Sequence, residues 1–527
     1  MSWAGFYLFL ALLSAACTLC AIVKARKLYW LVPGYFLTAW LCGELALIHV
    51  IWQLGVTALL AFTGNLSDRL AQSGLGVFVL SWLGLVYLHC QAMDSPTHLR
   101  SALYRALGRN YRAAIPEERQ HVLCDDIVAR HWLRPFRFKR SGVRVHSHIS
   151  YADAGKRNLL DIYHPHEPRE GGYPVLLQVH GGAWMIGEKE QQALPLMYHM
   201  AERGWLCVSI NYRLSPRTAF PAHIIDVKKA ITWVRENIRE YGGDPDFIAI
   251  TGGSAGGHLS SLAALTPNKA EWQPGFEQSD TTLQAAVPFY GVYDFTDRNG
   301  IRPGMSMEKM VADRVMQCSL DQNRPLWEDG SPLSHVSPAA PPMFVLQGTH
   351  DSLVWVEEAR VFVSALQAVA SQPVAYAELP GAQHAFEIFH SVRTDHTVHA
   401  VGHSWSGPTP NGCTSRQQQA DSPVADRGVR QRPPGLARRH ITPPGLQNGN
   451  RCQRRGFGAQ HPRSQLQGPK ASLFGASDFG AGQSSLGANQ KGCAGGRGRA
   501  GIRRAGPVME DQPGVSPGLA DPLIQGL

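Results

Sequence analysis

The chain has 527 residues, of which 44% are hydrophobic and only 17% charged, a charged fraction below the ~25% of an average soluble domain. The net charge of +9 is concentrated at one end. Residues 402–527 hold 16 Lys and Arg against 6 Asp and Glu, whereas the first 401 residues hold 34 against 35. The near-neutral body argues against a nucleic-acid-binding protein. The ten cysteines show no regular spacing, which argues against a disulfide framework and a zinc site.

Three apolar runs within residues 1–94 predict transmembrane helices. The first run, 2–23, carries no charged residue and reaches the length of about 20 residues that a membrane span requires. It lacks the preceding basic residue of a signal peptide, which favours a span over a cleaved leader. The second run, 28–62, is interrupted by Glu44 and is either one span or a broken pair. The third run covers 74–93.

Basic residues predict how these spans are oriented. Lys24, Arg26 and Lys27 follow the first run and should face the cytoplasm. With three spans, the chain is a multi-pass membrane protein whose catalytic domain is cytoplasmic, and a hairpin in the second run would reverse this. Glu44 is either a lipid-facing polar site or, as we favour, a carboxylate that faces inward or lies near the interface. The basic segment 95–142 is interpreted as a linker or cap region.

From residue 143 to 401, short apolar strands alternate with segments of helical periodicity. Continuous apolar runs are typical of strands that are buried on both faces. The alternation predicts an α/β fold, with a doubly wound, mostly parallel sheet and helices on both of its faces. The expected strands are 143–151, 159–163, 175–179, 206–210, 247–250, 285–290, 343–346 and 374–379, and the expected helices are 224–238, 255–265 and 356–370.

A candidate nucleophile follows the strand 247–250. Residues 252–256 form the pattern G-x-S-x-G between that strand and a helix, the context in which a serine is exposed on a sharp turn. Ser254 is therefore the predicted nucleophile. The alternative is a glycine-rich helix entry that binds phosphate, which predicts a lysine after the glycines. His258 and Leu259 follow instead.

A second glycine-rich segment, 180–184, directly follows the strand 175–179. An acyl-transfer enzyme must stabilise an oxyanion, and each fixed backbone N–H does so by about 3–4 kcal/mol. Residues Gly181, Gly182 and Ala183 are predicted to form this oxyanion hole together with Ala255, which follows the nucleophile. The alternative is an ordinary turn at the end of a strand.

The predicted acid and base follow two late strands. Asp351 comes after the strand 343–346 and His384 after the strand 374–379, in the order serine, acid, histidine. Both positions lie at the carboxyl ends of strands, where α/β sheets build their sites. Competing candidates are His350, His390, His396, His399, Asp294 and Asp297. His390, His396 and His399 fall on a polar helical stretch and are expected to be solvated. Asp294 and Asp297 follow a strand that comes too early in the chain to carry the acid.

These motifs resemble those of the α/β-hydrolase fold, and more narrowly those of the hormone-sensitive-lipase-type esterases, which carry H-G-G-G-W and G-D-S-A-G-G. The resemblance spans residues 143–389. Ala183 stands where that family has a glycine, and Gly253 where it often has an aspartate. The further matching segments are 211–216, 220–222 and 351–354.

This resemblance implies hydrolysis of a carboxylic ester through an acyl-serine, without cofactor or metal. It assigns Ser254 as the nucleophile, His384 as the base and then acid, and Asp351 as the residue that orients the base. We therefore expect a membrane-anchored esterase or lipase of class EC 3.1.1, acting on small-molecule or lipid acyl esters, with the bilayer as a partner and no nucleic acid. The alternatives are an amidase or formamidase with the same triad, or a non-catalytic membrane scaffold with a vestigial site.

The last 126 residues, 402–527, differ in character, with 23 Gly and 13 Pro. Such a composition is typical of low-complexity disorder. A closing helix begins at about residue 391 but does not continue past 401. We interpret the tail as disordered, either read in a shifted frame or an unrelated extension. The functional alternative is an Arg-rich arm that binds anionic lipid or RNA.

Overall fold

The computed structural model describes residues 2–24, 32–113, 115, 127–166, 172–302 and 306–404, all within one structural unit. The predicted tail lies outside the described residues from 405 onward, so its disorder and its reading frame stay predictions.

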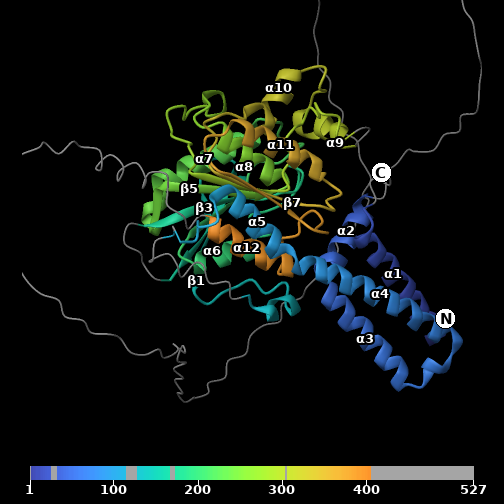
Figure 1. The fold of residues 1–527 in the computed structure, drawn as a ribbon. Helices are drawn as coiled ribbons and strands as arrows, with labels where there is room; N and C mark the ends of the chain where they lie inside the picture. The colour runs from blue at the N-terminus through green and yellow to red at the C-terminus, as the bar shows by residue number, and fades with distance from the viewer. Residues whose placement is uncertain are drawn as a thin grey trace, which may run out of the picture. The chain divides into compact units, whose positions relative to one another are not determined.

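An eight-stranded sheet organises the catalytic segment, in the order β1-β2-β4-β3-β5-β6-β7-β8 (Figure 1). Only the pairs β1–β2 and β2–β4 are antiparallel. The predicted fold class, a mostly parallel doubly wound sheet, is confirmed. The strands are β1 (Val143–Ser150), β2 (Leu159–Pro165), β3 (Tyr173–Val179), β4 (Leu206–Ile210), β5 (Gly243–Gly253), β6 (Ala285–Phe289), β7 (Met343–Gly348) and β8 (Val374–Leu379).

Helices cover both faces of this sheet (Figure 1). The helices on one face are α7 (Ala222–Asn237), α8 (Ala255–Leu265) and α11 (Val356–Val369), and those on the other are α5 (Ser95–Leu107), α6 (Leu194–Glu202) and α12 (Val392–Ser404). In β3, Val175, Leu177 and Val179 face the first layer, and Leu176 faces the second. The continuous apolar strands follow from this burial on both sides. The short helices α9 (Ser306–Met310) and α10 (Arg324–Asp329) lie between β6 and β7 in the chain.

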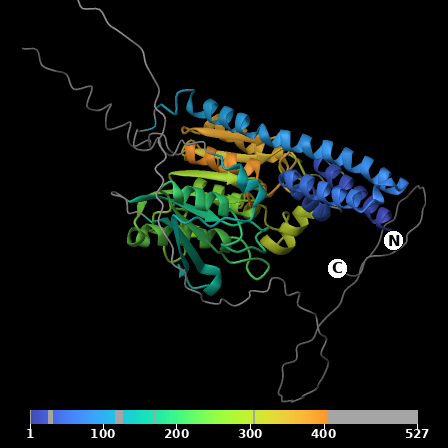
Figure 2. The same ribbon diagram turned by 90° about the horizontal axis from the view of Figure 1, so that it is seen from below.

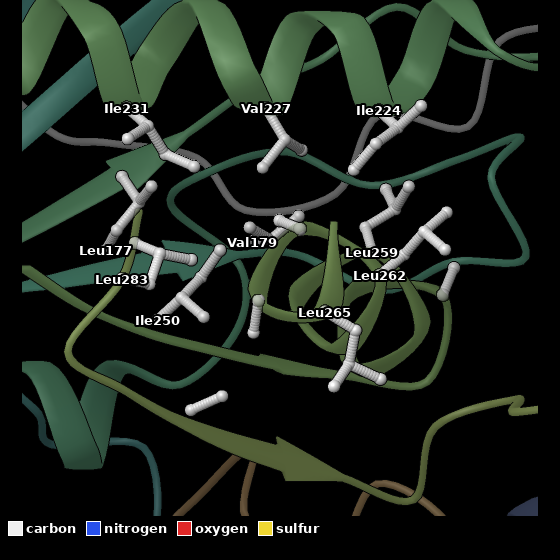
Figure 3. Close-up of a cluster of buried hydrophobic side chains, with 14 of the residues drawn as sticks. Leu177, Val179, Ile224, Val227, Ile231, Ile250, Leu259, Leu262, Leu265 and Leu283 are labelled. Carbon is white, nitrogen blue, oxygen red and sulfur yellow. The ribbon is translucent and has the colours of Figure 1, made fainter. Parts of the chain in front are cut away.

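The first layer is closed by the apolar face of α7. Ile224, Val227 and Ile231 point from α7 toward the sheet and α8, where Ile250 and Leu259 meet them (Figure 3). All five side chains are inaccessible to solvent. Burying such a side chain stabilises the folded state by about 1.5–3 kcal/mol. This packing therefore holds α7 against β3 and β5, the two strands that lead into the site.

The amino-terminal region forms four helices, α1 (Trp3–Ile22), α2 (Val32–Glu44), α3 (Ala46–Phe62) and α4 (Arg69–Met93). Among the described residues, two helices, α1 and the Arg69–Leu107 helix, are long and apolar enough to cross a membrane. The second apolar run forms α2 and α3, which are bent by 86° relative to each other and are either one broken span or a re-entrant loop.

The third apolar helix runs on from α4 into α5 in nearly the same direction (Figure 2). The segment expected to be a linker or cap thus begins with a helix that packs on β8. Leu99, Ala102 and Leu103 of α5 are buried in the second layer. The basic residues of α5 interrupt its apolar pattern in the sequence, so this buried face was not predicted.

Glu44, at the end of α2, faces inward rather than toward lipid, as we favoured. Its Oε1 lies 2.9 Å from Nη1 of Arg393, at the start of α12, and both side chains are almost completely inaccessible. Ser391 donates a hydrogen bond to the other carboxylate oxygen at 2.7 Å. Arg393 also donates to the carbonyl oxygen of Pro380 through Nε and Nη2, at 3.1 and 2.8 Å. This ion pair therefore fastens α2 to the catalytic segment.

We expect Arg393→Met to lower the free energy of unfolding by about 3–5 kcal/mol, because it leaves the Glu44 carboxylate buried without its partner. Adding Glu44→Leu should restore part of this loss, so that the double variant is more stable than the sum of the single effects predicts. Thermal melts of the detergent-solubilised full chain would measure this. Strictly additive losses would contradict a coupled pair.

Candidate active site

The predicted nucleophile lies on a strained turn between β5 and α8. Ser254 has φ 57° and ψ −119°, in a region that residues with a Cβ rarely adopt. Its N–H donates to the carbonyl oxygen of Phe289 at 3.0 Å. A Cβ at Gly256 would lie 2.0 Å from the Val179 carbonyl oxygen, and one at Gly252 would lie 2.5 Å from it. The two glycines of the motif are therefore required by the close approach of β3.

Asp351 and His384 meet at the carboxyl ends of β7 and β8. His384 Nδ1 lies 2.8 Å from Asp351 Oδ2, and both side chains are nearly inaccessible. Asp351 Oδ1 accepts hydrogen bonds from the backbone N–H groups of Leu353 and Val354 at 2.9 and 2.8 Å. Gln347, on β7, donates to Oδ2 at 3.0 Å. The carboxylate is thus held in one orientation, with its partner imidazole fixed at Nδ1.

Two glutamines that the sequence analysis did not single out support this pair. Besides Gln347, Gln383 ties the two loops together, because its Oε1 accepts from the N–H of Ser352 at 2.7 Å and of His384 at 2.9 Å. Both residues lie beside predicted motif positions, but an isolated glutamine carries no signal of such a role in the sequence.

Tyr290 lies between the nucleophile turn and the histidine. Its ring centroid is 4.4 Å from that of His384. Its hydroxyl donates to the buried carboxyl group of Glu387. A Cβ at Gly253 would lie 2.6 Å from the Tyr290 hydroxyl oxygen. Tyr290 thus accounts for Gly253, where the resembled family often has an aspartate, because a side chain there would collide with the tyrosine.

No hydrogen bond joins the Ser254 hydroxyl to His384 in the part of the chain that the structure describes. The serine side chain is half-buried at the turn. In active sites without substrate, such contacts are often long and tighten in the substrate complex. Tyr290 lies beside Gly253, the residue before the serine, and beside the ring of His384.

Three of the four predicted oxyanion donors have free amides among the described residues, namely those of Gly182, Ala183 and Ala255. The N–H of Gly181, the fourth predicted donor, instead donates to Oε1 of Gln192 at 2.6 Å. Gly182 and Ala183 have φ values of 117° and 51°. These conformations turn the loop directly after β3, next to the nucleophile turn.

Buried histidines anchor the two turns. Trp184 Nε1 donates to His258 Nδ1 at 3.2 Å, and His258 Nε2 lies 2.7 Å from the carbonyl oxygen of Gly330. His180 stacks on Tyr212 at a centroid distance of 4.4 Å. Burial lowers the pKa of His180 and of His258 to about 4, so both are neutral near pH 7. They hold the loops in position rather than transfer protons.

The competing candidates lie elsewhere. Asp294 binds Arg298 at 3.1 Å, and Asp297 accepts from the N–H of Ile301 at 2.8 Å. The prediction that His390, His396 and His399 are solvated is wrong. Helix α12 and the residues just before it pack between α5 and α6. His390 and His399 are buried and His396 is half-buried. His390 pairs with Asp395 instead, at 2.7 Å.

In the part of the chain that the structure describes, two side-chain clusters have the spacing of metal ligands, but a cationic side chain lies beside each. In the first, His131, His390 and Asp395, the Arg140 guanidinium lies 3.4 Å from both imidazoles. In the second, His148, Asp161 and Glu190, the Lys189 ammonium group lies 2.9 Å from Asp161. These positive groups already supply the charge that a metal ion would bring.

The pair Tyr290 and Glu387 predicts how stability changes with pH. Burial raises the pKa of Glu387 to about 7, above the ordinary value of about 4.3. The folded protein therefore holds a proton that the unfolded chain releases above about pH 4.3. The stability that this proton contributes is complete in acid and is lost as the pH rises through 7.

Glu387→Gln should therefore raise the melting temperature relative to the parent protein at pH 8, and raise it less at pH 5. Glu378→Gln is the matched control. At Glu378, burial is outweighed by the ion pair with Arg360, which holds the carboxyl pKa below its ordinary value. The control should therefore give no stabilisation at pH 8. Equal shifts of the Glu387→Gln protein at both pH values would contradict the raised pKa.

Comparison with known proteins places this chain in a family. Residues 160–366 match a family model described as BD-FAE. The chain is 44% identical over 432 residues to the probable carboxylic ester hydrolase LipM of Mycobacterium tuberculosis, covering 76% of this chain and 96% of LipM. It is 43% identical over 344 residues to esterase LipQ of the same organism, covering 64% and 79%. The match to LipM is longer than the whole segment 143–404, so it extends beyond the sheet domain.

Among solved structures, a truncated carbohydrate esterase from gut microbiota is similar, with 24% identity and a TM-score of 0.44. It covers 51% of this chain and 99% of that structure.

Proposed function

Because this chain belongs to the α/β-hydrolase esterases and is a serine carboxylesterase of class EC 3.1.1, we propose that it hydrolyses its ester through an acyl-serine on Ser254. His384 acts as base and then as acid, and Asp351 orients it. The observation that carries this proposal is the buried 2.8 Å contact between Asp351 and His384 at the same sheet edge as the strained Ser254 turn.

The proposed chemistry follows the arrangement of donors. His384 Nε2 takes the proton of the Ser254 hydroxyl as its oxygen attacks the ester carbonyl carbon. The negative oxygen that forms is stabilised by the N–H groups of Gly182, Ala183 and Ala255. The imidazolium then protonates the leaving alcohol oxygen. Water repeats the sequence on the acyl-serine and releases the acid.

We expect Ser254→Ala to reduce hydrolysis of a p-nitrophenyl ester by about a million-fold, the loss found when such a triad loses its serine. The parent protein should also react with a fluorophosphonate probe, and the variant should not. The matching p-nitroanilide, tested in parallel, separates an esterase from an amidase, and the ester should react faster. Turnover retained in the Ser254→Ala protein would contradict the proposed mechanism.

We further propose that the amino-terminal helices anchor the enzyme in a membrane, with small-molecule or lipid acyl esters as substrates. Large apolar side chains on these helices are exposed, with Phe62 91%, Trp3 75% and Leu80 68% accessible. An apolar surface of this kind on a soluble protein would favour aggregation, whereas in a bilayer it is stabilised by lipid.

The full-length protein should stay in the membrane fraction during an alkaline carbonate wash and be released by detergent. Release by carbonate would contradict an integral anchor. With α2 and α3 counted as one broken span, the catalytic domain faces the cytoplasm, and a membrane-impermeant fluorophosphonate should label Ser254 only after cell lysis. Labelling of intact cells would assign the opposite orientation.

A further inference from the structure

One face of α2 lies against the loop that carries His384. The Phe36 ring packs edge-on against the imidazole, with centroids 6.2 Å apart and planes at 74°. Phe36 stacks on Trp40 at 5.6 Å, and Trp40 packs against Phe389 at 5.1 Å. Phe36, Trp40 and Glu44 are spaced by four residues, so they lie along one stripe of the helix. The stripe ends in the buried Glu44 carboxylate.

The imidazole of His384 has little room for other neighbours. Asp351 occupies Nδ1 at 2.8 Å, and the ring of Tyr290 lies at a centroid distance of 4.4 Å. An ester attacked by Ser254 must bring its reacting group within reach of Nε2 of the same ring. Phe36 packs against this same ring, so it lies close to the group that the ester must reach.

Resting on the function proposed above, we propose that Phe36 is a specificity-determining residue of the esterase. In this proposal, α2 forms one wall of the ester-binding site and selects esters with a hydrocarbon chain over short ones. From Gly34 to Gly43 the helix carries no charged residue. The wall is uncharged and presents the rings of Phe36 and Trp40, so it offers a hydrocarbon chain contact without desolvating a charge.

The wall is fixed in place at its carboxyl end. The Glu44 carboxylate binds Arg393 at 2.9 Å and Ser391 at 2.7 Å, and Arg393 also donates to the Gly43 carbonyl oxygen at 3.2 Å. Moving α2 away from the site would separate these buried groups, which is costly. A helix of the apolar amino-terminal region is thereby a permanent part of the site.

The test compares Phe36→Ala with Leu37→Ala in the full-length protein, on p-nitrophenyl acetate and octanoate. Leu37 is the adjacent residue on α2, 49% exposed and outside the stripe. A hydrocarbon group in an apolar pocket is worth about tenfold or more in kcat/KM. Phe36→Ala should therefore lower kcat/KM about tenfold more for the octanoate than for the acetate. Leu37→Ala should leave the ratio of the two esters unchanged, and Phe36→Leu should restore most of it.

Three outcomes would overturn the inference. An equal loss on both esters would assign Phe36 a structural role. No loss on either ester would remove Phe36 from the binding site. An equal change of the ratio in Leu37→Ala would make the effect general to the helix. The Ser254→Ala variant shows whether a failure lies in the role of α2 or in the proposed mechanism. If that variant is inactive while the ratio does not respond to Phe36, only the role of α2 fails. If that variant is active, the proposed mechanism fails, and this inference with it.

Discussion

The close parallel pairing of β3 and β5 is the constraint on which the site depends. Val179 pairs with Gly252, so the loops that leave the two strands begin side by side. The approach is so tight that the Val179 carbonyl oxygen excludes any side chain at Gly256. One loop supplies the Gly182 amide and the other supplies Ser254, and their separation is set by backbone hydrogen bonds rather than by flexible side chains. Preorganisation of this kind costs nothing at the moment of reaction.

The proposed base is positioned by a different set of contacts, drawn from three distant parts of the chain and from the neighbouring Gln383. Asp351 holds Nδ1 of His384, Gln383 holds its backbone, Tyr290 packs on the ring, and Phe36 packs edge-on against it. Most of these partners are buried, so water has little access to the ring. Helix α2 of the amino-terminal region therefore supplies a direct neighbour of the proposed base.

Much of the fold was predictable because its signals are local. All eight strands were expected near their observed positions. The central strands are buried on both faces and give continuous apolar runs that sequence periodicity detects, whereas β1 is mostly exposed. Helix α5 was missed because its basic residues mask the buried Leu99 and Leu103. The later histidines were expected in solvent because α12 looks polar, yet the helix lies between α5 and α6, where tertiary packing overrides its composition.

The sequence by itself determined the strand order along the chain, the glycine-flanked Ser254 and the loop positions of Asp351 and His384, because each depends on a short motif next to a recognisable strand. Only the tertiary structure decided which amides remain free, since Gly181 is occupied by Gln192, eleven residues away. It also decided that Glu44 pairs with Arg393 and that Phe36 meets His384. These contacts join residues almost 350 positions apart, and no local pattern encodes a pairing at that distance.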